Sequence, residues 1–297
     1  MQEKVSDSER VEFLSGGHLA CQGCGAAITM RMALSVLGKK TVVVIPASCF
    51  SVICGPYPSS ALRVPVVHAA FETAAATATG IRAGLDARGQ TDAHVLAFAG
   101  DGGTFDIGLQ ALSGAAERNE NIIYACYDNE AYMNTGIQRS SATPWGAWTT
   151  TTPGGRLKSR PKKDIIRIMS GHRIPYIATA TPAYPDDLIS KFRKASETSG
   201  TRFIHILSPC PPGWKFPSNE TIKISRLAVE SRVFPLVEIF DGEEIQITHE
   251  PSGIDARDYL KAQGRFSYLS EKEVTHIRES VEYNWKQLLT SALWHGF

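Results

Sequence analysis

Phe98-Ala-Gly-Asp-Gly-Gly-Thr-Phe-Asp106 is the stretch from which the fold class of this chain can be predicted. Residues 95–99 are all small or apolar, which is typical of a strand buried in a parallel sheet. A turn follows at Gly100-Asp-Gly-Gly103, and we expect a helix to begin near Phe105. Ligands of open α/β sheets bind at this end of the strands. The stretch therefore predicts an α/β fold with a ligand site at Asp101.

A second segment, Tyr127-Asp-Asn-Glu-Ala-Tyr-Met-Asn-Thr-Gly136, follows the next predicted strand, residues 121–127. Asn129 lies 28 positions after Asp101, and their oxygens suit Mg²⁺, which also keeps phosphate oxygens in its shell. The glycines let the backbone approach a bulky anion, and the helix N-terminus faces it. An ordinary turn with Asp101 as a helix cap is the alternative, but the second segment at this distance favours a magnesium-diphosphate site.

The composition is that of a globular protein, with 43 % hydrophobic and 21 % charged residues. The net charge of +1 gives no indication of a nucleic acid or an anionic membrane as a partner. Residues 41–62 carry no charge, but their prolines, glycine and serines favour a buried strand and loop over a membrane span. The N-terminus lacks the apolar core of a signal peptide, and the six cysteines are expected to be reduced in a cytoplasmic protein.

Strands and helices alternate along most of the chain. Strands are predicted at 41–47, 64–68, 95–99, 121–127, 174–180 and 202–207, and helices at 69–85, 162–170 and 186–198. This order predicts a doubly wound, mostly parallel α/β domain over residues 17–216, after an N-terminal arm of residues 1–16. Residues 217–297 are expected to form a C-terminal extension for subunit contacts, with a two-stranded ribbon at 230–248 and a terminal helix at 271–293.

Four cysteines are candidate metal ligands. Cys21 and Cys24 form a CxxC pair, while Cys49 and Cys210 each follow a predicted strand, so all four could lie at one edge of the sheet. Their spacing alone leaves an iron–sulfur cluster, a zinc site and unrelated buried thiols equally open. Cys54 is a reserve ligand, whereas Cys126 lies within a strand and is expected to be a core thiol.

Several motifs in combination resemble the β-subunit family of pyruvate:ferredoxin oxidoreductase (pyruvate synthase), one of the 2-oxoacid:ferredoxin oxidoreductases. The similarity covers nearly the whole chain. The motifs are Gly17-His-x-x-Cys-x-Gly-Cys-Gly25, Arg63-Val-Pro-x-Val-His68, Gly100-Asp-Gly102, Asp128-Asn-Glu-Ala-Tyr-Met-Asn-Thr-Gly136, Ser208-Pro-Cys-Pro-x-Gly-Trp214 and Tyr259-Leu-x-x-Gln-Gly-Arg-Phe266.

The resemblance implies a thiamine-diphosphate-binding (PP-type) domain and the CoA-dependent, reversible oxidative decarboxylation of pyruvate to acetyl-CoA and CO₂, with ferredoxin as electron acceptor. It implies that Cys21, Cys24, Cys49 and Cys210 hold a [4Fe–4S] cluster, and that Asp101, Asn129 and the Ala131 carbonyl bind Mg²⁺. The implied cofactor-binding residues are Cys49, Asp101, Gly102, Gly103, Asn129, Glu130, Ala131, Tyr132, Met133 and Asn134, of which Asn134 is also the catalytic candidate.

The resemblance also implies partners of α, γ and δ type. The glutamate that activates thiamine is expected in a partner, as are most contacts to the 2-oxoacid and CoA, so the chain is predicted to be catalytically incomplete alone. Ala26 stands where many family members carry Glu, so a side-chain contact from that position is not expected. Site or packing roles are equally open for His18, His68, Arg139, Trp145 and Trp148.

Three other functions remain as alternatives. The first is a sister enzyme that uses 2-oxoisovalerate, oxalate or 2-oxoglutarate. The second is a cluster-free thiamine carboligase, which would leave the four cysteines without a role. The third is an iron–sulfur electron-transfer subunit that binds no thiamine.

Overall fold

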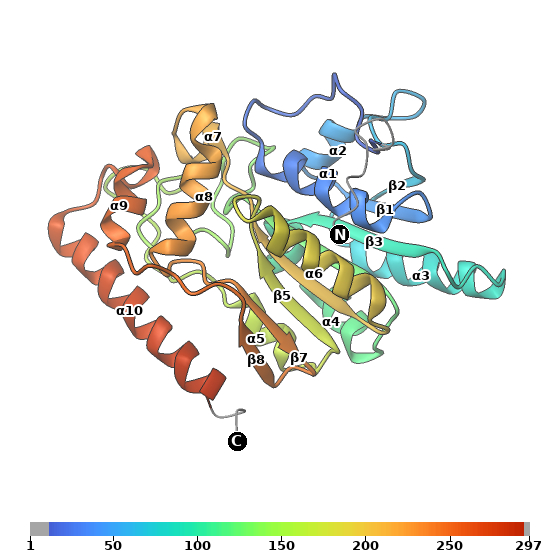
Figure 1. Ribbon diagram of the computed structural model, residues 1–297. Coiled ribbons are helices and arrows are strands. Elements are labelled where there is room, and N and C mark those ends of the chain that lie inside the picture. The colour runs from blue at the N-terminus through green and yellow to red at the C-terminus, as the bar shows by residue number, and fades with distance from the viewer. Residues whose placement is uncertain (1–11, 294–297) are drawn as a thin grey trace, which may run out of the picture.

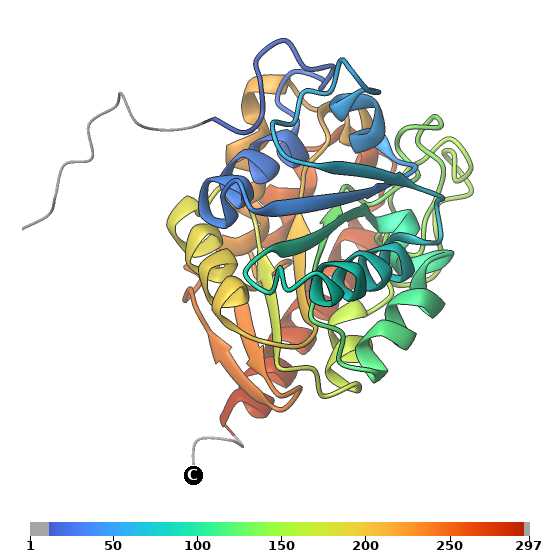
Figure 2. The same ribbon diagram turned by 90° about the vertical axis from the view of Figure 1, so that its right-hand side faces the viewer.

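The computed structural model describes residues 12–293, so most of the predicted N-terminal arm lies outside the described residues. Its described part, residues 12–16, pairs with residues 61–63, with an antiparallel bridge between Leu14 and Leu62. The centre of the molecule is one eight-stranded sheet with helices on both faces (Figures 1 and 2). No helix among residues 12–293 is long and apolar enough to span a membrane.

The sheet has the strand order β2-β1-β3-β4-β6-β5-β7-β8. Its strands are β1 (Thr41–Pro46), β2 (Val66–Ala69), β3 (His94–Gly100), β4 (Ile123–Asp128), β5 (Tyr176–Ala180), β6 (Arg202–Leu207), β7 (Val237–Phe240) and β8 (Glu244–Ile247). Strands β1 to β6 are mutually parallel, whereas β7 is antiparallel to both β5 and β8. The predicted mostly parallel α/β fold is confirmed.

Side chains that alternate along the central strands pack into two hydrophobic layers, one on each face of the sheet. Val43 and Ile45 of β1 face the layer that contains α1 (Gly25–Leu37), α2 (Cys49–Cys54) and α6 (Pro185–Glu197). Val44 faces the opposite layer, which contains α3 (Ala74–Ala87), α4 (Leu109–Glu117) and α5 (Ile165–Ser170). Both faces of the parallel strands are therefore covered, as the continuous apolar runs predict.

The turn after β3 differs from the expected simple helix start. Residues Gly102–Asp106 form one π-helical turn, η2, before α4 begins at Leu109. A β-carbon at Gly108 would lie 2.1 Å from the carbonyl oxygen of Gly103, so only glycine fits where this wide turn closes.

The C-terminal extension is continuous with the sheet. The domain ends with the short helix α7 (Pro211–Trp214). The extension contains α8 (Thr221–Glu230), α9 (Ala256–Lys261) and α10 (Glu271–Leu293), with 3₁₀ turns η3 (Ser218–Glu220) and η4 (Gly264–Phe266). The predicted ribbon starts later than expected, because α8 runs to Glu230, and its first strand extends the main sheet beside β5. Trp214, Tyr259 and Phe266 pack in a third hydrophobic cluster between the extension and the domain.

Candidate cofactor site

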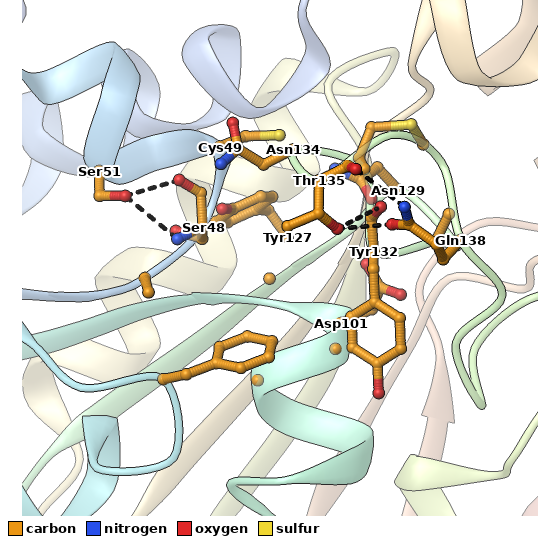
Figure 3. A pocket seen from close by; sticks show the side chains of 17 residues that line it. Ser48, Cys49, Ser51, Asp101, Tyr127, Asn129, Tyr132, Asn134, Thr135 and Gln138 are labelled. Atoms are coloured by element: carbon orange, nitrogen blue, oxygen red, sulfur yellow. Dashed lines mark hydrogen bonds between the residues drawn. The ribbon is translucent and has the colours of Figure 1, made fainter.

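A cavity of about 500 Å³ lies beyond the C-terminal ends of β1, β3 and β4 (Figure 3). Its wall includes residues 47–49 after β1, Gly100 at the end of β3 with residues 101–103 after it, and most of residues 129–135 after β4, together with Phe71. The cavity therefore occupies the edge of the sheet at which the sequence predicts a ligand site.

Asp101 is almost fully buried, with 1 % of its surface exposed. Its Oδ2 accepts a hydrogen bond of 2.5 Å from Ser140 Oγ, which directs Oδ1 toward Asn129. Burial and the neighbouring charge of Asp128 raise the pKa of the Asp101 carboxyl well above its usual value. A nearby cation would therefore stabilise the ionised form.

The side-chain amide of Asn129 lies 3.0 Å from Asp101 Oδ1 and 3.0 Å from the Ala131 carbonyl oxygen. With its nitrogen toward them, this amide donates to both oxygens. In the opposite orientation the Asn129 amide places its oxygen beside these two oxygens instead. The atom bound at this point decides between the two orientations. A carboxylate, an amide and a carbonyl oxygen form a donor set that suits Mg²⁺. The three residues fit the predicted metal site.

Two aromatic rings hold the glycine turn in place. A β-carbon at Gly102 would lie 2.3 Å from the Tyr132 ring, and one at Gly103 would lie 3.3 Å from the Phe71 ring. The two rings meet edge to face with centroids 6.1 Å apart. Tyr132 is anchored by its hydroxyl, which donates to Asp106 Oδ2 at 2.6 Å. The turn can thus offer its backbone to a ligand on the cavity side only.

Glu130 is the exception among the predicted cofactor-binding residues, because it does not line the cavity. Its carboxylate points into the interior and pairs with Lys162 and Arg265, each at 2.6 Å. Asp128, two positions before Glu130, also pairs with Lys162 and accepts from His205 at 2.7 Å. Although burial opposes it, this pairing lowers the pKa of Asp128 to about 2.

The other predicted residues of this segment do line the cavity. Ala131, Tyr132, Met133 and Asn134 lie on its wall, and Asn134 is exposed at its mouth. Asn134 is thus accessible to a substrate.

The loops that carry the four candidate cysteines lie close together. A β-carbon at Gly25 would lie 3.1 Å from Ser208 Cα, so the CxxC loop packs directly against the segment before Cys210. Burial, and then charge repulsion from the Cys24 and Cys21 thiolates, raise the pKa of Cys49 to about 12. Burial also raises the pKa of Cys210 to about 12, with a smaller contribution from the same neighbours.

Within residues 12–293 no three Cys, His, Asp or Glu side chains are arranged as ligands of one ion. Each thiolate of a [4Fe–4S] cluster binds a different iron atom, so its sulfurs lie further apart than the ligands of a single ion. The four cysteines are thus close enough to influence one another's pKa but are not arranged as ligands of a single ion. Cys54 is instead buried against Ser60, and Cys126 lies in the core as predicted.

The five residues with open roles make protein contacts outside the cavity wall. His18 and His68 bond to nearby backbone groups, Trp145 meets His276 edge to face, and Trp148 lies under the Lys215 ammonium. The exposed Arg139 donates its backbone amide to Thr151 Oγ1. Sequence reasoning missed Ser140, Phe71, Lys162 and Trp214 as neighbours of the site. Of these four residues only Lys162 has a sequence feature that could have indicated it, because it lies in the basic segment 156–163.

The comparisons with known proteins agree with this geometry. A family model described as thiamine pyrophosphate enzyme, C-terminal TPP binding domain, matches residues 46–206. The chain is 52 % identical over 275 residues to the pyruvate synthase subunit PorB of Methanothermobacter thermautotrophicus, which covers 91 % of this chain and 95 % of that relative. It is 49 % identical over 289 residues to the ketoisovalerate oxidoreductase subunit VorB of Pyrococcus furiosus, which covers 93 % and 92 %.

A solved structure shares the fold. A 2-oxoglutarate:ferredoxin oxidoreductase from Magnetococcus marinus, with 2-oxoglutarate, coenzyme A and succinyl-CoA bound, matches with a TM-score of 0.59 and 22 % identity. The match covers 73 % of this chain and 81 % of that chain.

Proposed function

Because this chain belongs to the thiamine-pyrophosphate-binding subunits of the 2-oxoacid:ferredoxin oxidoreductases, the family of its PorB and VorB relatives, we propose that it is the β subunit of a pyruvate:ferredoxin oxidoreductase. The proposed reaction converts pyruvate and CoA to acetyl-CoA and CO₂ and passes two electrons to ferredoxin, reversibly. One observation carries the proposal: the cavity with three convergent oxygens lies beside the four-cysteine group, and Cys49 belongs to both.

Asp101, Asn129 and the Ala131 carbonyl would hold Mg²⁺ and, through it, the diphosphate. Thiamine diphosphate, when bound, supplies the electron sink that lets a 2-oxoacid lose CO₂. The chain's own residues bind and orient: Ser140 fixes the Asp101 carboxylate, and Tyr132 and Phe71 keep the glycine turn open to a diphosphate. The apolar part of the wall, including Ala47 and Met133, limits water at the reacting end.

Cys21, Cys24, Cys49 and Cys210 would hold a [4Fe–4S] cluster. As thiolates they would lose the mutual repulsion that raises the pKa values of Cys49 and Cys210, because iron neutralises their charge. The position of Cys49 on the cavity wall would bring the cluster close to the reacting end of the cofactor. That proximity supports the transfer of electrons out of the cavity.

The chain would work within a complex of α, γ and δ-type subunits in the cytoplasm. Among the described residues that line the cavity, Asp101 is the only acid, and it is committed to the metal site. The mouth is bordered by the exposed residues Asn134 and Thr135. A partner subunit would therefore supply the activating glutamate and most contacts to the 2-oxoacid and CoA.

A branched-chain 2-oxoacid is the second candidate substrate, because the identity to VorB is nearly as high as that to PorB. Assay of the intact complex with pyruvate, 2-oxoisovalerate, 2-oxoglutarate and oxalate distinguishes them. Pyruvate should give the highest kcat/KM, and a higher value for 2-oxoisovalerate would assign the branched-chain activity instead.

Iron and acid-labile sulfide content test the cluster, with electron paramagnetic resonance after dithionite reduction of the anaerobically purified complex. Cys54→Ser should keep the wild-type cluster signal, whereas Cys49→Ser should lose or alter it. Zinc in place of iron would rule out the proposed electron path. Calorimetry with thiamine diphosphate and Mg²⁺ tests the other half, since Asp101→Ala should abolish binding.

A further inference from the structure

A cluster of buried charges beneath the metal-binding loop takes no part in the function proposed above. Arg265 Nη2 lies 2.6 Å from Glu130 Oε2, and their side chains are only 2 % and 5 % exposed. Neither residue lines the cavity. Arg265 belongs to the motif Tyr259-Leu-x-x-Gln-Gly-Arg-Phe266, to which the chemistry of the site gives no role.

The backbone of Glu130 connects this pair to the metal site. Glu130 has φ of +64°, in the left-handed region that residues with a β-carbon rarely adopt. It stands between Asn129 and Ala131, so this conformation is what turns the oxygens on either side of it toward one point. The Glu130 carbonyl is held by Thr143 Oγ1 at 2.7 Å, and its carboxylate is held by Arg265 and Lys162.

Trp214 makes a second connection. Its Nε1 donates to the carbonyl oxygen of Asn129 at 2.7 Å. The Arg265 guanidinium lies over the same indole, 3.7 Å from the ring centroid. Arg265 thus fixes both the side chain of one residue in the metal loop and the indole that anchors the residue before it.

Arg265 is itself held firmly by the C-terminal segment. Its Nε donates to Gln263 Oε1 at 2.9 Å, and Gln263 in turn donates to the Tyr259 carbonyl at 2.7 Å. A β-carbon at Gly264 would lie 2.8 Å from Lys215 Cβ, so the segment packs closely against the residue after Trp214. The guanidinium is therefore preorganised by residues far from the cavity in sequence.

We propose that Arg265 is a positioning residue for the metal-diphosphate loop, so that the C-terminal extension completes the cofactor site of its own chain. The proposal rests on the proposed function, because it concerns the same Mg²⁺ and thiamine diphosphate. The C-terminal extension would then have a role within its own subunit, besides any contacts that it makes with other subunits. Removing the guanidinium leaves a buried carboxylate with one partner fewer, which frees Glu130 to move.

The test is calorimetric titration of the cofactor-depleted complex with thiamine diphosphate at several Mg²⁺ concentrations. Arg265→Met and the nearly isosteric Glu130→Gln should each weaken binding by at least about tenfold and raise the Mg²⁺ concentration needed for half-saturation, since these residues orient the metal ligands. Glu238→Gln is the matched control: Glu238 is also buried and paired, with Lys194 Nζ at 2.5 Å and Tyr176 Oη at 2.6 Å, but lies on β7 away from the cavity.

The control should lower the thermal midpoint of unfolding as much as Glu130→Gln while it leaves cofactor affinity within about twofold. Unchanged affinity in both Glu130→Gln and Arg265→Met would overturn the proposal, as would an equal loss in Glu238→Gln. Glu130→Gln decides the matter if Arg265→Met does not assemble. Failure of the wild-type complex to bind thiamine diphosphate would instead reject the proposed function itself.

Discussion

Ser140→Ala should weaken the binding of Mg²⁺ and thiamine diphosphate without blocking folding. Ser140 Oγ donates to Asp101 Oδ2 at 2.5 Å, and the structure shows no other side-chain donor to this oxygen among the described residues. A hydrogen bond to a charged group contributes about 1.5–3 kcal/mol. At about 1.4 kcal/mol per tenfold, the loss corresponds to about 10-fold to 100-fold in affinity, provided that Asp101 is ionised in the loaded site.

The assay is isothermal titration of the cofactor-depleted complex, with Ser141→Ala as the matched control. Ser141 also donates to a carboxylate, that of Asp106, but Asp106 keeps the Tyr132 hydroxyl at 2.6 Å and the Ser141 amide at 3.1 Å after the substitution. The control should therefore change the affinity by less than about threefold, because its acid remains hydrogen-bonded. Wild-type affinity in Ser140→Ala, or an equal loss in both variants, would refute the reasoning.

Three further predictions concern other parts of the chain. Gly102→Ala should reduce cofactor affinity at least about tenfold, because its β-carbon would lie 2.3 Å from the Tyr132 ring. Gly84→Ala is the control and should leave the affinity unchanged in calorimetry, because there is open space around Gly84. Although burial opposes it, hydrogen bonds from Tyr184, Ser252 and His249 lower the pKa of Glu230 from 4.5 to about 2. The ionised carboxylate therefore contributes its full stability above pH 4.5, and this contribution is lost as the pH falls toward 2. Thermal unfolding of wild type and Glu230→Gln should converge over that interval, and a constant gap would contradict the assignment. Lys158→Met should expose loop 141–161 to proteolysis, because the Lys158 ammonium donates to carbonyls of Ser141, Thr143 and Pro161; unchanged cleavage would show that other contacts hold the loop.

The parallel core could be predicted from sequence because its signals are local. Buried parallel strands are short apolar runs, and the residues that follow them meet at one edge whatever the strand order is. This is why Asp101, Asn129 and Cys49 could be placed together without a structure. The attachment of β7 to β5 could not be predicted, because alternation identifies a ribbon but not the strand beside which it pairs.

The partners of the site residues were harder to predict than the residues themselves. Ser140, which bonds to Asp101, lies 39 positions away in a polar loop without periodicity. Glu130 lies within the same motif as the cavity-lining residues, but its backbone is left-handed and its side chain pairs with Arg265 in the interior. The ion pair with Arg265 depends on the packing of the C-terminal segment, for which no local pattern exists.

Cys49 lies where the two halves of the site meet, and this position predicts different effects for two cysteine substitutions. Cys21 is exposed and lies off the cavity wall, whereas Cys49 lies on that wall. Both Cys21→Ser and Cys49→Ser should lower iron and labile sulfide, because four thiolates hold such a cluster. Only Cys49→Ser should also change the affinity for thiamine diphosphate, because of the two cysteines only Cys49 lines the cavity proposed to hold that cofactor. Equal affinities in the two variants would mean that Cys49 belongs to the cysteine group alone, and that the cavity and the cluster are functionally separate.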